Sequence, residues 1–402
     1  MTFLLFWGAV SLLAYTYVLF PLLVWVRGAL GERPYTSAEI TPRVTLIIAA
    51  HNEGDTIAAK LANVLALDYP RDRLETIVAS DGSTDETEGI VRRCAGPSVR
   101  LLPLSRQGKA KTLNAAVAAS TGEILVFSDA NSMYDAQALR ALVRPFADLE
   151  VGGVAGNQVY LADSRSAVTG IGERRYWDFD RMVKRSQGLA GNVTSATGAI
   201  YAIRRSLFSD VPEAVTDDFV TSTRVVAQGY RLVFAQDAVA YEAVAGSGKV
   251  EFRRKVRIIT RGLRAVLVMR ALLNPFRYGF YALQLFSHKV MRRLMVFPLL
   301  VLICVSPVLW HEGLLYQLAT LGQAGFCACA ALGWLLHHRH SPPQILALPS
   351  FFCMVNAASL LATFNVVLGR RITQWEPRRP ASQVARPTAS ASFERDPRAL
   401  PH

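Results

Sequence analysis

The sequence predicts an α/β domain with a doubly wound, mostly parallel β-sheet, flanked by helices that cross a membrane. Between residues 40 and 245, short apolar runs alternate with segments of helical spacing, as strands and helices alternate in such a sheet. Outside this stretch, long apolar runs occur near the N-terminus and again within residues 288–370. The chain has 402 residues, which is enough for one domain with a sizeable core.

The first apolar run covers residues 3–26 and is long enough to cross a bilayer as a helix. It has no basic stretch before it and no small-residue cleavage site after it, so we do not expect a cleaved signal peptide. Arg27 and Arg33 follow the run, and the positive-inside rule then places the next domain in the cytoplasm. We therefore expect an integral protein of a plasma membrane or bacterial inner membrane, with a transmembrane helix at 1–27.

The strands of the predicted sheet are separated by helices. The run Val44–Ala50 is apolar throughout, as expected for a strand buried on both faces. Ser83 and Glu86 have the spacing of a capping box at the start of a helix. Polar residues follow several strands and are expected to meet beyond their carboxyl ends, where such sheets bind ligands. Further strands are predicted at 74–80, 99–102 and 123–128, and helices at 56–67, 84–94, 109–119 and 220–227.

Residues 250–273 predict an amphipathic helix. Apolar residues recur every three or four positions, and arginines that include Arg257 and Arg261 form a stripe on nearly the opposite face. This pattern suits a helix that lies in the membrane interface. The alternative is a surface helix packed on the soluble domain, but the long apolar segments that follow favour the interface.

The C-terminal region contains hydrophobic segments at 291–310, 314–336 and 345–368. Three full crossings would leave Arg370 and Arg371 on the side opposite the soluble domain, against the positive-inside rule. The last segment contains Asn356 and other polar residues, so either it is re-entrant or the number of crossings differs from three. The tail at 376–402 is rich in Pro, Ser, Ala and Arg and is predicted to be disordered.

The charge and cysteine content exclude several classes of protein. The net charge is +13, and the arginines gather beside the hydrophobic runs and in the tail, which fits a membrane surface. No basic sheet with interleaved aromatic residues is apparent, so nucleic-acid binding is not expected. Four of the five cysteines lie in hydrophobic segments and none forms a CxxC pair, so neither a disulfide framework nor a zinc site is expected.

Asp129 and Asn131 follow a predicted buried strand. Side chains two positions apart on an extended segment point to the same face, so both can present an oxygen to a hard cation such as Mg²⁺ or Mn²⁺. The alternative is that Asp129 caps the next helix.

Three other strand or loop ends carry groups suited to chemistry on a nucleotide. Asp81 can hydrogen-bond a base or ribose, or can simply close a turn. Lys109 begins a predicted helix and can meet a phosphate as a point charge, or can be solvated. Asp217 and Asp218 precede the helix predicted at 220–227: Asp217 fits a helix cap, and Asp218 fits either a cap or a general base.

Taken in order, these motifs resemble glycosyltransferase family 2, the membrane-bound group related to cellulose and hyaluronan synthases, from about residue 44 to residue 242. The resemblance implies a Rossmann-like GT-A fold. It implies contacts with the nucleotide by Ala50, His51 and Glu53 in the first motif and by Asp81 and Ser83 in the second. It places Lys109 at the family's lysine-containing helix start, Asp129 and Asn131 at its metal-binding motif, Thr197 and Gly198 at its acceptor turn, and Asp217 and Asp218 at its catalytic motif, with Asp218 as the base.

Two positions depart from the family pattern. Asn131 stands where the metal motif has a second Asp, so it can supply an oxygen but no charge. The region 254–262 keeps Arg257 and Arg261, to which the resemblance gives a place at the substrate, but it lacks the Gln and Trp of the motif that processive synthases carry. Their absence favours addition of one sugar over chain extension.

The predicted protein is thus a membrane-bound, metal-dependent, inverting glycosyltransferase. It would move a sugar from a nucleotide-sugar, first of all a UDP-sugar, to a lipid-linked or growing glycan acceptor in polysaccharide or glycolipid synthesis, with further partners in a glycan assembly complex. One alternative is a processive polysaccharide synthase that also exports its polymer. The alternative from another class is a non-catalytic membrane scaffold or nucleotide-sugar sensor.

Overall fold

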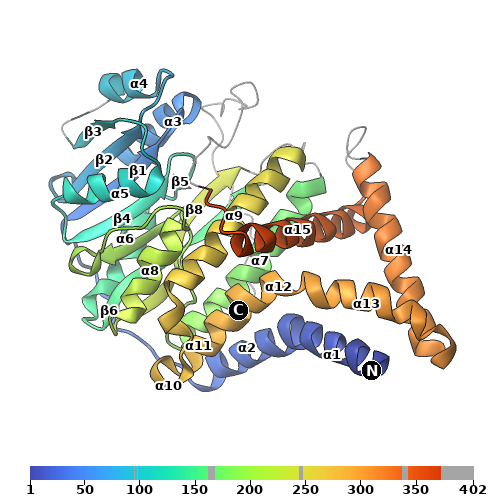
Figure 1. Cartoon of the computed structure of the whole chain (residues 1–402). Helices are drawn as coiled ribbons and strands as arrows, with labels where there is room; N and C mark the ends of the chain where they lie inside the picture. The colour runs from blue at the N-terminus through green and yellow to red at the C-terminus, as the bar shows by residue number, and fades with distance from the viewer. Residues whose placement is uncertain (95, 97, 162–167, 244–247, 337–342, 373–402) are drawn as a thin grey trace.

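The computed structural model describes residues 1–372 apart from 95, 97, 162–167, 244–247 and 337–342, with the backbone alone for 168–178, 243 and 248–250. The tail predicted at 376–402 lies outside the described residues. Figure 1 shows a sheet with helices on one side of the molecule, which we call the sheet domain (residues 44–243), and a group of long helices on the other. The second group, which we call the helical region, consists of α1 (Thr2–Ala14), α2 (Phe20–Leu30) and the helices α9–α15 between residues 248 and 367.

One half of the sheet is parallel. Its strands are β1 (Val44–Ala50), β2 (Leu74–Asp81), β3 (Val99–Leu104) and β4 (Ile124–Asp129). Val44 is level with Leu74 on one neighbour and with Ile124 on the other, so the strands end together. The predictions of strands at 44–50, 74–80, 99–102 and 123–128 are confirmed. Because the strands are parallel, the polar residues that follow β1, β2 and β4 lie along one edge of the sheet.

The other half of the sheet is mixed. Its strands are β5 (Met133–Tyr134), β6 (Val151–Leu161), β7 (Tyr201–Arg204) and β8 (Arg231–Ala243). The strand order across the whole sheet is β3-β2-β1-β4-β7-β6-β8-β5. The short strand β7 runs antiparallel to β4 and β6, whereas β6 and β8 are parallel. The predicted class, a mostly parallel α/β sheet, is therefore confirmed, but the antiparallel part was not predicted.

Helices cover both faces of the sheet because side chains of each strand alternate between them. Leu46 and Ile48 face a core formed with α3 (Gly54–Leu65), α4 (Thr87–Cys94) and α6 (Ala138–Val143). Ile47 and Ala49 face a second core, formed with α5 (Lys109–Ala118), α8 (Asp217–Ala227) and α11 (Phe280–Leu285). All four side chains are almost fully buried.

The predicted start of α4 is wrong. The helix begins at Thr87, and the carboxylate of Asp85 accepts a hydrogen bond from the Thr87 amide at 3.0 Å. Ser83 does not cap this helix, because its hydroxyl accepts a bond from the Asn52 amide, 3.2 Å away at the end of the neighbouring strand. A contact between two strand ends thus overrides the local capping-box spacing of Ser83 and Glu86.

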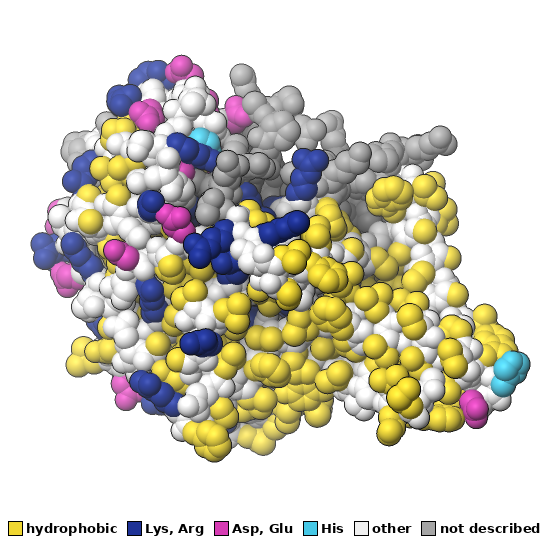
Figure 2. Space-filling model, in the orientation of Figure 1, with side chains coloured by type: hydrophobic (Ala, Val, Ile, Leu, Met, Phe, Trp, Pro, Cys, Tyr) yellow, Lys and Arg dark blue, Asp and Glu magenta, His cyan; other side chains and the backbone are white. Residues whose placement is uncertain are grey.

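Three helices are long and apolar enough to cross a membrane: Thr2–Leu30, which is α1 and α2 joined by a π-helical segment, α14 (Leu314–Leu336) and α15 (Gln344–Val367). A fourth candidate is the pair Phe280–Leu294 and Val296–Val308, which is bent by 47°. On the face shown in Figure 2, hydrophobic side chains gather over these helices, whereas most charged side chains lie over the sheet domain and its border with them. An apolar surface of this extent is typical of contact with lipid.

The amphipathic helix is α9 (Gly248–Val268), which lies between the sheet domain and α15 (Figure 1). Its apolar face, with Val256, Ile259 and Leu263, packs against Ala358 and Ala362 of α15. Much of the face that we expected at the membrane interface is therefore covered by another helix. The position of α9 relative to a bilayer stays a prediction.

The C-terminal helices begin in contact with the sheet domain and end in contact with α9, which lies next to that domain. At the start, the Tyr281 hydroxyl donates a hydrogen bond to the carbonyl of Thr194 at 2.9 Å. At the end, Arg264 of α9 donates to the carbonyl of Arg370 at 2.9 Å. Figure 1 shows α13 (Val296–Val308) leading away from the sheet domain and α15 returning to it. A region whose two ends lie on one side crosses a bilayer an even number of times, so this arrangement does not accommodate three full crossings.

The polar residues of α15 do not interrupt the helix. The Asn356 amide donates to the carbonyl of Phe352 at 2.9 Å, and the Ser359 hydroxyl donates to that of Val355 at 2.9 Å. Polar side chains whose hydrogen bonds are made within the helix are tolerated in lipid. The arrangement also places Arg370 and Arg371 on the side of the sheet domain, as the positive-inside rule requires.

We expect Arg371→Cys, in a variant without the five native cysteines, to react with an impermeant maleimide from the same side as Asp55→Cys in the sheet domain. Glu312→Cys, in the exposed turn between α13 and α14, should react from the other side. Labelling of right-side-out and inverted vesicles measures this. Reaction of positions 371 and 312 from the same side would contradict the arrangement.

Candidate active site

The carboxyl end of β2 is tied to the start of α5 through Asp81. The Asp81 side chain is fully buried, and its Oδ1 accepts hydrogen bonds from the amides of Gln107 at 2.7 Å and Gly108 at 2.9 Å. Gly108 has a φ of 91°, which is costly for any residue with a Cβ. Asp81 therefore holds the turn that presents Lys109, whether or not it also contacts a nucleotide.

The end of β1 lies against the end of β2 and forms a wall with it. Nδ1 of His51 lies 2.9 Å from the carbonyl oxygen of Asp81. Burial, together with Arg106, lowers the pKa of His51, so its imidazole is neutral at physiological pH. Ala50 is fully buried, and the Glu53 carboxylate accepts a bond from Thr56 at 2.9 Å. The structure thus brings together the five residues expected at the nucleotide: Ala50, His51, Glu53, Asp81 and Ser83.

Lys109 connects two of the motifs. Its Nζ lies 2.9 Å from Oδ1 of Asp129 at the end of β4 and 3.2 Å from Oδ2 of Asp217 at the start of α8. All three side chains are largely buried. Burial alone would lower the pKa of Lys109, but Asp129 and Asp217 outweigh it, and the pKa is raised. From the sequence we expected Lys109 to meet a phosphate, and we did not predict its ion pairs with Asp129 and Asp217.

The acceptor turn approaches Asp129 from the other side. A Cβ atom on Gly198 would lie 3.3 Å from Oδ2 of Asp129, so the absence of a side chain allows the close approach. Next to it, the Thr197 hydroxyl oxygen is buried and has no hydrogen-bond partner among the described residues, and the same holds for Thr216. Both threonines line the cavity into which Asp218 opens. Buried polar atoms of this kind call for a ligand or water; Thr216 was not among the residues that we expected to bind substrate.

Asp218 has the environment of a general base. It lines the cavity, while one of its oxygens accepts a hydrogen bond from the Phe219 amide at 2.8 Å. Burial, aided by the adjacent charge of Asp217 and opposed by Lys109, raises the pKa of Asp218 to about 6. A carboxylate with this pKa is ionised at neutral pH and is a stronger base than an ordinary aspartate. Asp217, by contrast, forms an ion pair with Lys109.

The two arginines of α9 differ in their surroundings. Arg261 is buried, and its Nε donates a hydrogen bond to the carbonyl of Val215 at 2.9 Å. It therefore holds the loop that leads to Asp217 and Asp218. Arg257 lies half-buried on the same helix, one turn earlier.

Lys60 of α3 supports the turn after Asp129 and was not predicted. Its side chain is fully buried, its ammonium donates to the Ser132 carbonyl at 2.5 Å, and it lies 3.9 Å from the ring centre of Tyr134. Burial lowers the pKa of Lys60 to about 7. The signal in the sequence was a lysine on the apolar face of the helix predicted at 56–67, between Ile57 and Leu61.

The site fits a divalent cation that arrives with a diphosphate. Lys109 faces the carboxylates of Asp129, Asp217 and Asp218, and Lys60 and Lys289 are the next cations to act on Asp129 and Asp218. Asp129 and Asn131 offer a carboxylate and an amide oxygen on one turn. In the described part of the chain, no group of three or more His, Cys, Asp or Glu could hold a metal. Mg²⁺ commonly uses one or two protein carboxylates and completes its shell with substrate phosphates and water.

Residues 42–260 match the family described as glycosyltransferase like family 2, which is more than half of the chain. The chain belongs to this family.

Two curated relatives illustrate the range of the family. The chain is 26% identical over 249 residues to the poly-β-1,6-N-acetyl-D-glucosamine synthase of Staphylococcus aureus, a match that covers 60% of each chain. It is 28% identical over 227 residues to a probable glycosyltransferase, YdaM, of Bacillus subtilis, with 54% of each chain covered. The chain thus spans about 60% of the length of the curated relatives it matches first.

Among solved structures, the mannosyltransferase PcManGT from Pyrobaculum calidifontis, in complex with GDP-Man and Mn²⁺, superimposes with a TM-score of 0.68 at 25% identity. The match covers 91% of this chain and the whole of that one. The sheet domain therefore has the GT-A fold, as the sequence implied.

We expect Lys109→Ala to lower the free energy of unfolding by about 3–5 kcal/mol in metal-free buffer, because it leaves two largely buried carboxylates without their shared cation. Lys111→Ala is the matched control. Its exposed pair with Glu213 should contribute less than about 1 kcal/mol. Urea unfolding followed by tryptophan fluorescence measures both. Equal effects of the two changes would show that the Lys109 bridge does not stabilise the site.

Proposed function

We propose that this glycosyltransferase moves a sugar from a nucleotide-sugar to an acceptor hydroxyl, with inversion at the anomeric carbon. The observation that supports this most directly is the position of Asp218. Its carboxylate has a pKa raised to about 6, opens into a large cavity, and lies beside the cluster of Lys109, Asp129 and Asp217. A base on the acceptor side and a diphosphate site on the donor side are what a direct displacement needs.

The donor binds at the wall formed by the ends of β1 and β2. Ala50, His51, Glu53, Asp81 and Ser83 contact the nucleoside, and a UDP-sugar is the first donor to test. A GDP-sugar is the second, because the relative PcManGT was solved with GDP-Man. Asp129 and Asn131 would hold Mg²⁺ or Mn²⁺, which when bound neutralises charge on the diphosphate. Mn²⁺ in PcManGT supports that choice of ion.

The reaction proceeds at the junction of the two sides. Thr197 and Thr216 orient the acceptor hydroxyl toward Asp218, which takes its proton as the acceptor oxygen bonds to the anomeric carbon. The bond from this carbon to the diphosphate breaks at the same time, and the nucleoside diphosphate leaves. Lys109 keeps Asp129 and Asp217 in place, and the charge of Asp217 makes Asp218 more basic. Arg261 fixes the loop that carries Asp218 through Val215.

The acceptor is a lipid-linked or growing glycan in polysaccharide or glycolipid synthesis, and the sheet domain lies on the cytoplasmic side of the membrane. Partners in a glycan assembly complex would supply or remove that glycan. The second candidate is a processive synthase that exports its polymer, and the Staphylococcus aureus relative, a polysaccharide synthase, favours it. Product length separates the two, because long polymer from one nucleotide-sugar would exclude single addition.

We expect Asp218→Asn to lower sugar transfer by about 100- to 10,000-fold while nucleotide-sugar binding persists, because only the base is lost. The wild-type rate should rise about tenfold per pH unit up to pH 6, where Asp218 loses its proton, and level off above it. Membranes with the protein, a panel of radiolabelled nucleotide-sugars and counting of the lipid and polymer fractions measure both. Asp210→Asn, an exposed residue of the same loop, is the control. Undiminished transfer by Asp218→Asn would refute the assignment of the base.

We expect EDTA to lower transfer by about 100-fold or more, since a metal contributes several kcal/mol of charge stabilisation, and added Mn²⁺ or Mg²⁺ to restore it. The Asp129→Ala variant should need a higher metal concentration for half-maximal rate than the wild type. The initial rate is measured across a metal titration. Full wild-type activity in chelator would remove the metal role of Asp129 and Asn131.

A further inference from the structure

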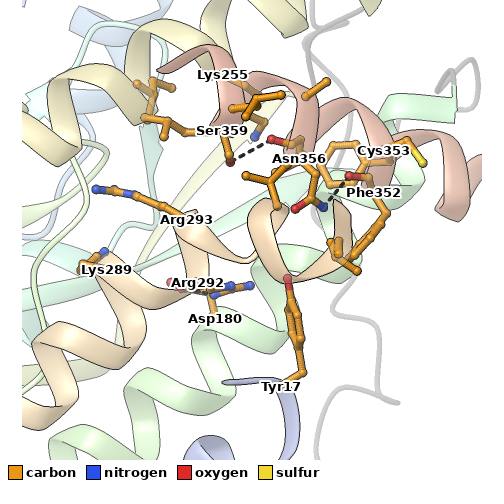
Figure 3. A pocket seen from close by; sticks show the side chains of 18 of the residues that line it. Tyr17, Asp180, Lys255, Lys289, Arg292, Arg293, Phe352, Cys353, Asn356 and Ser359 are labelled. Atoms are coloured by element: carbon orange, nitrogen blue, oxygen red, sulfur yellow. Dashed lines mark hydrogen bonds and ion pairs between the residues drawn. The ribbon is translucent and has the colours of Figure 1, made fainter. Parts of the chain in front are cut away.

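A cavity of about 1130 Å³ connects the candidate base with the helical region. At one end it is lined by Thr197, Thr216 and Asp218, and at the other by α13, α14 and α15. Pockets for small molecules commonly measure about 300–1,000 Å³, so this cavity has room for more than one sugar ring. Figure 3 shows its middle part, where the labelled charged side chains lie near residues of α15 such as Asn356 and Ser359.

A group of four cations stands in this middle part, which we call the headgroup cluster: Lys255 of α9, Lys289, and Arg292 and Arg293 of α12 (Arg292–Leu294). The described residues that line the cavity include six Lys or Arg and two Asp or Glu, and two of the cations, Arg254 and Lys255, pair with Glu251 at 2.8 and 3.2 Å. One of the two acids that line the cavity, Asp180, is shared by Lys184 at 3.2 Å, His288 at 3.0 Å and Arg292 at 3.7 Å. Lys289 makes no ion pair with any described residue. Positive charge held out of water in this way is offset best by an anion.

Arg293 reaches the cavity edge across a glycine of α9. A Cβ atom on Gly262 would lie 2.6 Å from Nη1 of Arg293, so only a residue without a side chain leaves room for the guanidinium here. Glycine within a helix costs about 1 kcal/mol relative to alanine. The glycine that leaves room for Arg293 thus makes α9 less stable, which suits a functional role for this arginine.

Beyond the headgroup cluster, the cavity is mainly apolar, with aliphatic and aromatic side chains and only Gln323, Asn356 and Ser359 as amide or hydroxyl groups among its described lining residues. It is lined there by Leu299, Leu300 and Ile303 of α13 and by Leu348 and Leu360 of α15. The hydroxyl groups of a glycan would find few hydrogen-bond partners among such side chains, and burying them unpaired is costly. A hydrocarbon chain has no such requirement.

Two π-helical segments meet beside the cluster. Tyr15–Leu19 in the first membrane helix and Phe286–Met291 after α11 are joined by a hydrogen bond of 2.8 Å between the Tyr15 and Ser287 hydroxyls. The first contributes Tyr17 to the cavity, and the second contributes His288 and Lys289. Isolated π turns occur often at functional sites, where they re-aim side chains.

We propose that the acceptor is carried by a lipid phosphate or diphosphate: the headgroup cluster binds the phosphate, the chain lies between α13 and α15, and the attached sugar presents its hydroxyl to Asp218. This proposal rests on the function proposed above and specifies its acceptor. It explains why the anion site, the apolar walls and the base share one cavity. A neutral polymer would not use the headgroup cluster.

Binding to the full chain in neutral detergent tests the proposal with farnesyl diphosphate, farnesol and inorganic pyrophosphate as probes. We expect farnesyl diphosphate to bind at least tenfold more tightly than either other probe, because it alone satisfies both parts of the cavity. Arg293→Ala should weaken it by about 10- to 100-fold through the loss of charge-assisted hydrogen bonds. Arg253→Ala, which changes an exposed arginine of α9, should not weaken binding.

Gly262→Ala provides a test that removes no charge. Alanine favours the helix more than glycine does, so the unfolding temperature should not fall. The added methyl group displaces Arg293, so the affinity for farnesyl diphosphate should drop about tenfold. Gly325→Ala in α14, where a Cβ atom meets nothing within 4 Å, is the matched control. Unchanged binding in both Gly262→Ala and Arg293→Ala would overturn the proposal.

Nucleotide-sugar binding in the same samples separates the two proposals. If the protein binds its nucleotide-sugar but not farnesyl diphosphate, the lipid site is refuted and the proposed function stands. Failure of both ligands in wild-type protein would overturn both. Pyrophosphate that binds as tightly as farnesyl diphosphate would identify a site for free phosphate, and equal binding of farnesol would exclude the anion site.

Discussion

The ion pairs of Lys109 are the constraint on which the rest of the site depends. Lys109 begins α5, Asp129 ends β4 and Asp217 begins α8, so one ammonium group fixes the relative position of three elements. The same contacts commit Asp217 and leave Asp218 to face the cavity. Residues that touch none of the reacting groups support this arrangement: Asp81 holds the turn before Lys109, Lys60 the turn after Asp129, and Arg261 the loop before Asp217.

Much of the sheet and the identity of the site motifs could be predicted from the sequence. Strands such as Val44–Ala50 are apolar throughout because both faces are covered, and that pattern needs no knowledge of their partners. The two-residue strand β5 and the four-residue strand β7 carry no such pattern, because their place is decided by pairing with β8, β4 and β6. The start of α4 was wrong for a related reason: Ser83 bonds to a neighbouring strand end.

The contacts between the motifs could not be predicted from the sequence. Lys109 and Asp217 are far apart in the chain, and no spacing rule shows that they pair. The cavity was even harder to predict, because the residues that line it come from many segments between Tyr17 and Leu360. Nothing in the order of Lys255, Lys289 and Arg293 indicates that they share one space. The return of the C-terminal helices to α9 likewise became visible only through long-range contacts such as that between Arg264 and Arg370.

Helix α9 has a bearing on how such enzymes can be recombined. On one side it holds the loop before Asp217 through Arg261. On the other it packs against α15 and donates a hydrogen bond to Arg370, shortly after the end of that helix. A chimera that joins this sheet domain to the membrane helices of a relative would lose the contacts of α9 either with the loop before Asp217 or with α15. The smallest exchangeable unit therefore includes α9 and α15 together with the sheet domain, even though they lie far apart in the chain.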